Sequence, residues 1–231
     1  MTVERVWYAA YGSNLFEKRF TYYRAGGNPP GTPRLYGGFR DPTPPARNCP
    51  LSLPGCVYFA GQSPVWSGGV AFYAHRPPPG WPVGAAARGY LLTVGQFSDL
   101  MAQEMHRQPG HGPVFDPEEV VRRGSLHLGD GHYETLWHVD DVDGIPVLTF
   151  TAPDSPLTVD LTKPSARYLS MLAGGLGESH GWPPDRILHY LSDLPGVRDF
   201  WDPEELRTVV DGRSLTGQSP DRPQPSNGPS R

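Results

Sequence analysis

The segment from Arg88 to His106 constrains the fold of this chain more than any other. Its first seven residues, Arg-Gly-Tyr-Leu-Leu-Thr-Val, predict a strand, and Gly95 ends that run. The residues that follow have helical spacing, since Phe97, Leu100 and Met101 stand at positions i, i+3 and i+4. The fold must therefore accommodate a strand that leads at once into an amphipathic helix.

The other predicted elements do not alternate regularly between strand and helix. Short apolar runs predict strands near residues 6–11, 57–59, 69–73, 133–139 and 145–151, and helical patterns stand near 165–176, 184–191 and 203–210. Asp143-Gly144 joins the last two strands and is a strong hairpin signal. An order of strands, helix, strands and then helices favours an α+β fold over a doubly wound sheet.

Glycine and proline separate these elements with long turns. The chain has 28 Gly and 28 Pro, and they are dense in two loops, near residues 40–56 and 76–86. Its 11 Tyr, 9 Phe and 6 Trp nevertheless predict a folded core, because disordered chains are poor in large aromatic residues. Residues 213–231 lack an apolar anchor after Leu215. We therefore expect one domain over residues 1–212 and a disordered tail over 213–231.

Charge and cysteine content narrow the classes of partner. A formal charge of −4 and a pI near 6.0 give no electrostatic case for binding nucleic acid or an anionic membrane. No window approaches the ~18 apolar residues of a membrane span, and no signal peptide is visible at the N-terminus. Cys49 and Cys56 are too few for a secreted disulfide scaffold. We expect a cytoplasmic protein, and the sequence leaves monomer and homodimer open.

Several common cofactor and nucleophile motifs are missing from the sequence. There is no Gly-x-Gly-x-x-Gly after a strand, no phosphate-binding loop and no Gly-x-Ser-x-Gly elbow. His127, His132 and His138 have a spacing that fits no common zinc pattern. We therefore predict no cofactor and no metal.

The segment Tyr11-Gly12-Ser13-Asn14-Leu15 follows directly on the first predicted strand. Glycine relieves a tight turn, and serine or asparagine caps a helix, so the segment can be an ordinary strand-to-helix turn. A turn of this kind also exposes consecutive backbone N–H groups, which can hold a carboxylate or a developing oxyanion. The residues alone leave both interpretations open.

Glu104 lies one turn after Leu100, beside the apolar stripe of its predicted helix. A glutamate late in an amphipathic helix is usually solvated. Its place next to Phe97 and Met101 also allows partial burial, which would raise its pKa toward the range of a general acid or base. Here too the residues alone do not decide between the two interpretations.

Three blocks of the chain resemble the γ-glutamylcyclotransferase-like family and stand in the family's order. Tyr8 to Leu15 is similar to the Tyr-Gly-Ser-Asn signature that opens one branch of the family. Gly-Tyr-Leu-Leu, followed by Phe97-x-x-Leu-x-x-x-Glu104, resembles the second block, whose terminal Glu is catalytic. Pro-Ser-x-x-Tyr168-Leu and a later Gly-Trp-Pro-Pro are similar to the third block. The resemblance extends from about residue 6 to about residue 195.

The resemblance implies an α+β domain built on a small mixed-strand β-barrel flanked by helices, with one pocket and no cofactor. It implies a small-molecule γ-glutamyl substrate whose α-amine attacks its own γ-carbonyl, which releases 5-oxoproline and a free amine or amino acid. Glu104 is then the base and afterwards the acid. Tyr11 to Leu15 bind the γ-glutamyl group, and Tyr168 borders the pocket through its hydroxyl. Because an internal attack has proximity built into the substrate, it needs no protein nucleophile, and Ser13 is not assigned as one.

Differences from the family pattern keep other functions open. Met105 follows Glu104 where compact family members often have Gly, which allows a non-catalytic binding module on the same fold. The loops near residues 40–56 and 76–86 resemble additions to the compact form that shape the pocket mouth. They keep open the removal of a γ-glutamyl protecting group from a bulkier biosynthetic intermediate. The Ser-Asn continuation differs from the Ser-Leu form of the glutathione-specific branch, so we do not predict glutathione as substrate.

Overall fold

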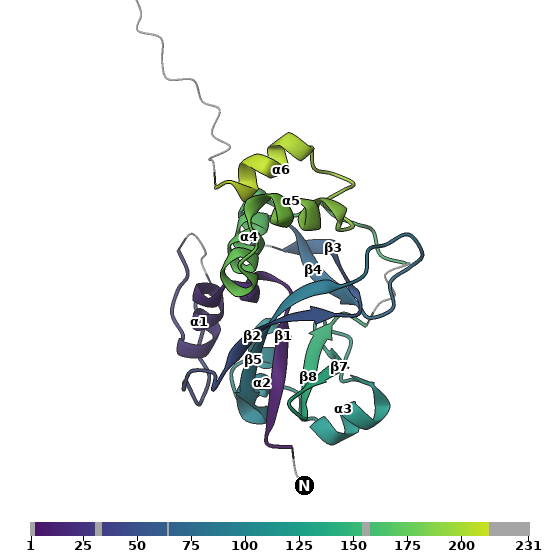
Figure 1. Ribbon diagram of the computed structural model, residues 1–231. Coiled ribbons are helices and arrows are strands. Elements are labelled where there is room, and N and C mark those ends of the chain that lie inside the picture. The colour runs from purple at the N-terminus through teal and green to yellow at the C-terminus, as the bar shows by residue number, and fades with distance from the viewer. Residues whose placement is uncertain (1–2, 31–33, 64, 154–157, 213–231) are drawn as a thin grey trace, which may run out of the picture.

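The computed structural model describes residues 3–30, 34–63, 65–153 and 158–212 (Figure 1). Six strands form the main sheet: β1 (Arg5–Ala10), β2 (Asn48–Leu53), β5 (Ala85–Thr93), β6 (Ser125–His127), β7 (Thr135–Val142) and β8 (Ile145–Thr151). Two more strands form a separate ribbon, β3 (Cys56–Ser63) and β4 (Gly68–Ala74). The helices are the short 3-10 turn η1 (Ser13–Leu15), α1 (Glu17–Ala25), α2 (Val94–Glu104), α3 (Pro117–Arg123), α4 (Ala166–His180), α5 (Pro184–Asp193) and α6 (Pro203–Val210). The predicted tail, residues 213–231, lies outside the described residues.

The first strand lies in the interior of the main sheet, whose order is β2-β5-β1-β8-β7-β6. It pairs antiparallel with β5 and parallel with β8, so the sheet is mixed. Trp7 and Ala9 pack into a core with α4, α5 and α6, while Val6 and Tyr8 pack into a second core with α1 and α2. Because successive strand residues point to opposite faces and both faces are covered, β1 is apolar over nearly its whole length.

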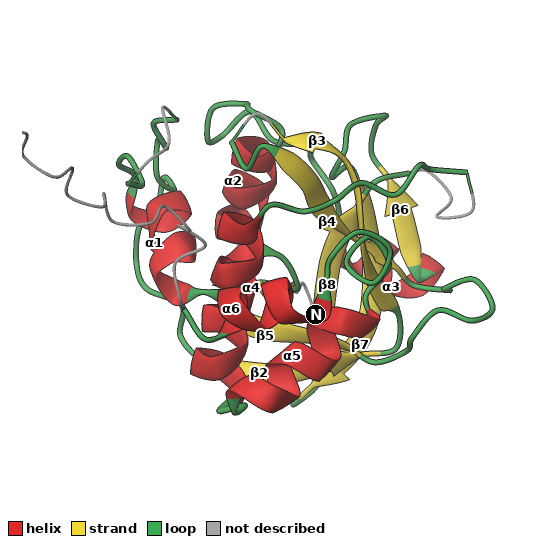
Figure 2. Cartoon of the chain, turned by 90° about the horizontal axis from the view of Figure 1, so that it is seen from above, coloured by secondary structure: helices red, strands yellow, loops and turns green. Residues whose placement is uncertain are grey.

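The helices gather in groups rather than alternating with the strands. In Figure 1, α4, α5 and α6 lie together at the top of the view, and α2 and α3 lie at the opposite end. Figure 2 shows most helices on one side and the strands β3, β4, β6 and β8 on the other. This segregation confirms the predicted α+β class.

The predicted β-barrel is wrong, because the main sheet is not closed. β2 and the three-residue β6 stand at its two ends, and β3 and β4 pair only with each other as a ladder. The ribbon meets β8 through a side chain instead: the backbone N–H of Tyr73 donates to the Thr151 hydroxyl at 3.0 Å. A closing ladder would need a backbone carbonyl at that position.

Some local predictions hold and others do not. α6 has the predicted bounds, and Asp143 and Gly144 both have positive φ, as a two-residue hairpin turn requires. The segment 40–56, predicted to be a loop, contains β2. Its Pro50 is tolerated there because β2 is an edge strand. Gly181 in the left-handed conformation ends α4 after His180, beyond the predicted end near residue 176.

Within the described residues, no helix combines the length and the apolar character that crossing a bilayer requires.

Candidate functional site

The turn after β1 is held closely on both sides. The Tyr11 hydroxyl donates to the Phe150 carbonyl of β8 at 2.8 Å, and the Leu15 N–H closes the turn on the Gly12 carbonyl at 2.9 Å. A Cβ at Gly12 would lie 3.1 Å from the Tyr168 hydroxyl oxygen, which is tighter than most real contacts. The close approach of Tyr168 therefore favours glycine at this position. No side chain caps η1, so neither Ser13 nor Asn14 has the capping role that sequence allowed.

Glu104 is the last residue of α2, a helix whose start is well defined. Thr93 and Gln96 form a capping box, in which each side chain bonds the backbone of the other. Phe97 and Leu100 of the same helix are fully buried, as their spacing predicts. The helix is thus fixed at its first turn and along its apolar face.

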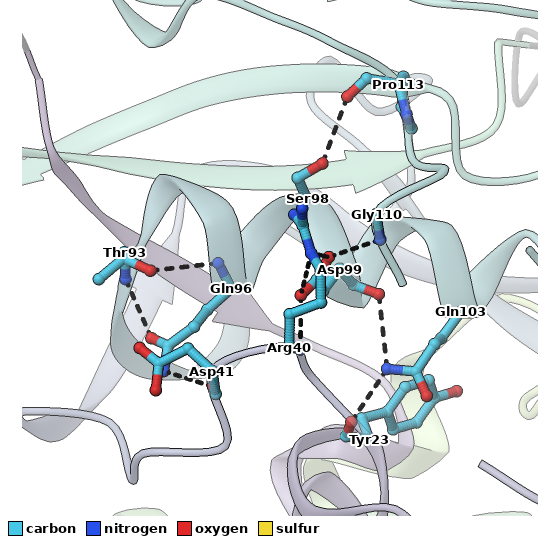
Figure 3. Close-up of polar contacts among 10 residues, drawn as sticks. All are labelled: Tyr23, Arg40, Asp41, Thr93, Gln96, Ser98, Asp99, Gln103, Gly110 and Pro113. Atoms are coloured by element: carbon cyan, nitrogen blue, oxygen red, sulfur yellow. Dashed lines mark hydrogen bonds and ion pairs between the residues drawn. The ribbon is translucent and has the colours of Figure 1, made fainter. Parts of the chain in front are cut away.

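Asp99 and Gln103 fix the second half of α2 against neighbouring loops (Figure 3). The buried Asp99 carboxylate accepts from the Arg40 backbone N–H and Nε and from the Gly110 N–H, all at 2.9 Å. The Gln103 side-chain amide donates to the Tyr23 carbonyl at 2.9 Å, which joins α2 to α1. Asp99 and Gln103 precede Glu104 by five residues and one residue. Their contacts hold the end of α2 that carries Glu104.

Glu104 and the turn after β1 are in direct contact. Asn14 Nδ2 donates to Glu104 Oε1 at 3.2 Å and lies 3.3 Å from the Tyr8 hydroxyl. The Asn14 carbonyl accepts from the Tyr90 hydroxyl at 2.8 Å, which holds the turn in place. The Glu104 carboxylate therefore faces the turn rather than solvent on the far side of its helix.

A cavity of about 380 Å³ lies between this turn, α1, the β3–β4 ribbon and the end of α2. This volume is within the range of small-ligand pockets. The segment from Tyr11 to Asn14 lines it, and so do Glu104 and the neighbouring Met105. Leu15, which was also expected to bind substrate, is instead buried against α4 and is not one of the lining residues.

The surroundings of Glu104 act on its protonation in opposite directions. Burial raises the pKa of Glu104 and outweighs the other effects. The Arg34 charge, a hydrogen bond from Tyr23, the Arg19 charge and the Asn14 hydrogen bond each lower that pKa. A carboxyl with a raised pKa holds a proton more readily than an ordinary glutamate, which suits a group that must accept a proton and then return it.

Tyr168 lies behind the cavity wall rather than on it. Its hydroxyl accepts from the Ala71 N–H at 3.3 Å and forms a hydrogen bond with the Ser13 backbone. Both Ala71 and Ser13 line the cavity. Burial raises the pKa of Tyr168, so it is a neutral phenol at ordinary pH. Its contacts suit holding the turn in place.

Several cavity residues were not identified from the sequence. Arg19 and Tyr23 come from α1, and Arg34 and Tyr36 come from the loop after it. His106 and His132, which the sequence analysis left without a role, also line the cavity. The spacing of Arg19 and Tyr23, one helical turn apart just after the Gly-Ser-Asn turn, is the signal that could have identified α1 as a wall of the site.

Possible metal ligands do not gather in the part of the chain that the structure describes: no three His, Cys, Asp or Glu side chains come together there as a metal site needs. Cys49 and Cys56 are both free thiols, and burial raises the pKa of Cys56 to about 12.

Comparison with known proteins gives weak similarities. No protein-family model matches the chain. The chain is 29% identical over 187 residues to Histone deacetylase 5 of Arabidopsis thaliana, a match that covers 75% of this chain but only 28% of that protein. Its structure is similar to that of a Gamma-glutamyl cyclotransferase, with a TM-score of 0.47 and 15% identity. It is also similar to the human uncharacterized protein loc79017, with a TM-score of 0.46 and 18% identity. Both structural matches cover 90% of this chain and 99% of the other. Similarity at this level assigns neither a family nor an activity.

Proposed function

We propose that the chain is a γ-glutamylcyclotransferase-like enzyme of the Tyr-Gly-Ser-Asn branch. The observation that carries this proposal is the 3.2 Å contact between Asn14 Nδ2 and Glu104 Oε1 at the wall of one cavity. Two sequence blocks that lie 90 residues apart, and that resemble the binding and catalytic blocks of that family, thereby meet at a single site.

Glu104 is the proton carrier in the proposed reaction. Its carboxylate takes a proton from the α-amine of a γ-glutamyl amide, and the amine nitrogen attacks the γ-carbonyl carbon of the same molecule. The tetrahedral intermediate then collapses, and the protonated Glu104 returns the proton to the leaving nitrogen as the amide C–N bond breaks. The products are 5-oxoproline and a free amine or amino acid, and Glu104 ends in its starting state.

The turn from Gly12 to Asn14 stabilises the charge that develops on the γ-carbonyl oxygen. The first N–H groups of a helical turn have no intrahelical acceptor, and η1 has no side-chain cap. The Ser13 backbone is already bonded to Tyr168, so the Asn14 N–H is the proposed donor. Backbone N–H groups fixed in a partly buried cavity stabilise an oxyanion without having to reorganise. Tyr168 and Tyr90 hold this turn in position and act through it.

The test is release of 5-oxoproline from a panel of γ-glutamyl amino acids and amines, with Glu104→Gln in parallel. We expect product from the parent protein and a loss of about 10²- to 10⁴-fold in the variant, the usual contribution of general acid–base catalysis. Glu118→Gln on α3 is a matched control, since Glu118 is exposed and lies outside the cavity. A folded parent that releases no product from any member, bulky γ-glutamyl amides included, would refute the cyclotransferase and favour a binding module.

A further inference from the structure

Arg19 is a buried cation with unmet hydrogen-bonding capacity at the cavity. The residue is only 4% exposed, and it lines the cavity from α1. Its Nη2 donates to the Tyr36 hydroxyl, but neither Nε nor Nη1 has an acceptor among the described residues. Buried N–H groups of a guanidinium are costly to leave unpaired. An arginine in this state points to an acceptor that arrives with a ligand.

Arg34 places a second guanidinium against the same tyrosine ring, that of Tyr36. The Arg34 group lies 4.5 Å from the centre of the Tyr36 ring, and the Arg19 group lies 4.6 Å from the same centre. Arg34 also donates to the Gln103 carbonyl, one residue before Glu104. Among the described lining residues, these two arginines face a single carboxylate, Glu104. The described lining thus carries two arginine side chains and one carboxylate, a composition that favours an anionic ligand.

The substrate's own geometry indicates which anion fits. In a γ-glutamyl group the α-amine and the α-carboxylate are bonded to the same carbon atom. If Glu104 holds the amine, the carboxylate lies only a few bonds away from it, in the cavity that Arg19 and Arg34 line and close enough to Glu104 for the charges of both arginines to act on it. The turn from Gly12 to Asn14 is then left for the γ-carbonyl oxygen.

We propose, on the basis of the cyclotransferase function above, that Arg19 and Arg34 form the subsite for the α-carboxylate of the γ-glutamyl group. The two guanidinium groups make the site specific for γ-glutamyl amides over 4-aminobutyryl amides. The latter have the same chain length from amine to carbonyl and cyclise to 2-pyrrolidinone, but they lack the α-carboxylate. Neither arginine donates a proton in the reaction; both bind and orient the substrate.

The experiment measures kcat/KM for matched pairs of γ-glutamyl and 4-aminobutyryl amides that share one leaving amine. The parent protein should prefer the γ-glutamyl member. Arg34→Gln should lower that preference by about 10- to 100-fold, the usual effect of removing a charge-assisted hydrogen bond. The ratio is the readout because a changed pKa of Glu104 affects both substrates equally. Arg122→Gln, at an exposed position on α3, is the matched control. Arg19→Gln is the corresponding variant of the other arginine. If it does not fold, Arg19→Lys replaces it, because lysine keeps the buried charge.

The outcomes separate this inference from the proposed function. If the parent cleaves γ-glutamyl amides and Arg34→Gln slows both members of a pair equally, the arginines have only a structural role and the inference is wrong. If the loss instead follows a carboxylate on the leaving amine, compared between γ-glutamyl amino acids and γ-glutamyl amines, the subsite lies on the other side of the scissile bond. If the parent cleaves neither member of any pair, the proposed function itself fails.

Discussion

Helix α4 approaches the turn after β1 so closely that only glycine fits at the point of contact. A Cβ at Gly175 would lie 2.6 Å from the Leu15 carbonyl carbon and 2.7 Å from the Phe16 nitrogen. Ordinary contacts begin near 3.4 Å, so Gly175→Ala must separate the helix and the turn by about 0.8 Å. The atoms in the way are two backbone atoms and the Leu15 Cβ, none of which can rotate aside. Gly174 provides the matched control, because a Cβ there would lie 3.5 Å from the Phe16 ring, an ordinary contact.

The two alanine variants should therefore differ in stability: Gly174→Ala should stabilise the fold, and Gly175→Ala should leave it at best unchanged. Alanine is better than glycine in a helix interior by ~0.8–1 kcal/mol, which Gly174→Ala should gain in full. Gly175→Ala gains the same amount but adds an overpacking cost of ~1–3 kcal/mol. Each kcal/mol corresponds to about 2–4 °C in melting temperature for a chain of this size. Differential scanning calorimetry of both variants measures the difference directly.

The same displacement should reach the candidate site. The turn that would move continues directly from Gly12 to Asn14, and a misplacement of about 1 Å can cost ~10²-fold in rate. We expect Gly175→Ala to lose cyclotransferase activity at temperatures where it is fully folded, and Gly174→Ala to retain it. If the two variants match in melting temperature, the close approach of α4 to the turn is wrong, whatever the activity.

Three further changes test the site and its support. Because burial raises the pKa of Glu104 in the folded state, the protonated form stabilises the fold, and that contribution is lost as the pH rises through the raised pKa. Glu104→Gln should thus melt higher than the parent at about pH 8 and equally at about pH 4; a lower melting temperature at both would contradict the burial argument. Arg34→Gln should move the acid limb of the kcat/KM profile to higher pH, since the Arg34 charge lowers the pKa of Glu104; an unmoved limb would show that Glu104 is not the titrating base. Asp99→Ala removes the acceptor of Arg40 and Gly110 and should cost about 2 kcal/mol or more in urea unfolding, whereas a neutral effect would mean that the loops hold α2 by other contacts.

The parts of the fold that sequence predicts well are those fixed by local chemistry. The strand from residue 88 and the helix after it follow from apolar spacing, and Asp143-Gly144 determines its own turn through positive φ. The segment around Pro50 was mistaken for a loop because its residues are weak strand formers. Pairing with β5 along an edge makes it a strand, and that pairing is a tertiary interaction that local propensity does not contain.

The site divides in the same way. Glu104 and the Gly-Ser-Asn turn were identified through a family resemblance, and the structure brings them together. Arg19 and Arg34 were missed because a surface helix and a Pro/Gly-rich loop usually carry solvated arginines. Arg19 is buried because α1 packs into the fold, where the Gln103 amide of α2 donates to the Tyr23 carbonyl, and this packing is a tertiary interaction that local sequence does not contain. The barrel was expected from the resemblance alone, and no pattern in the residues tests whether a sheet closes.

The alternation of β1 between two cores has a consequence for how the protein responds to heat. The turn after β1 packs against α4, which contributes to one core. Glu104 is the last residue of α2, which contributes to the other core. The contact between Asn14 and Glu104 thus depends on the packing of both cores, and loosening of either core would lengthen it. On warming, activity should be lost when the less stable of the two cores loosens, at a temperature below that of global unfolding. The temperature of inactivation would therefore report the stability of that core.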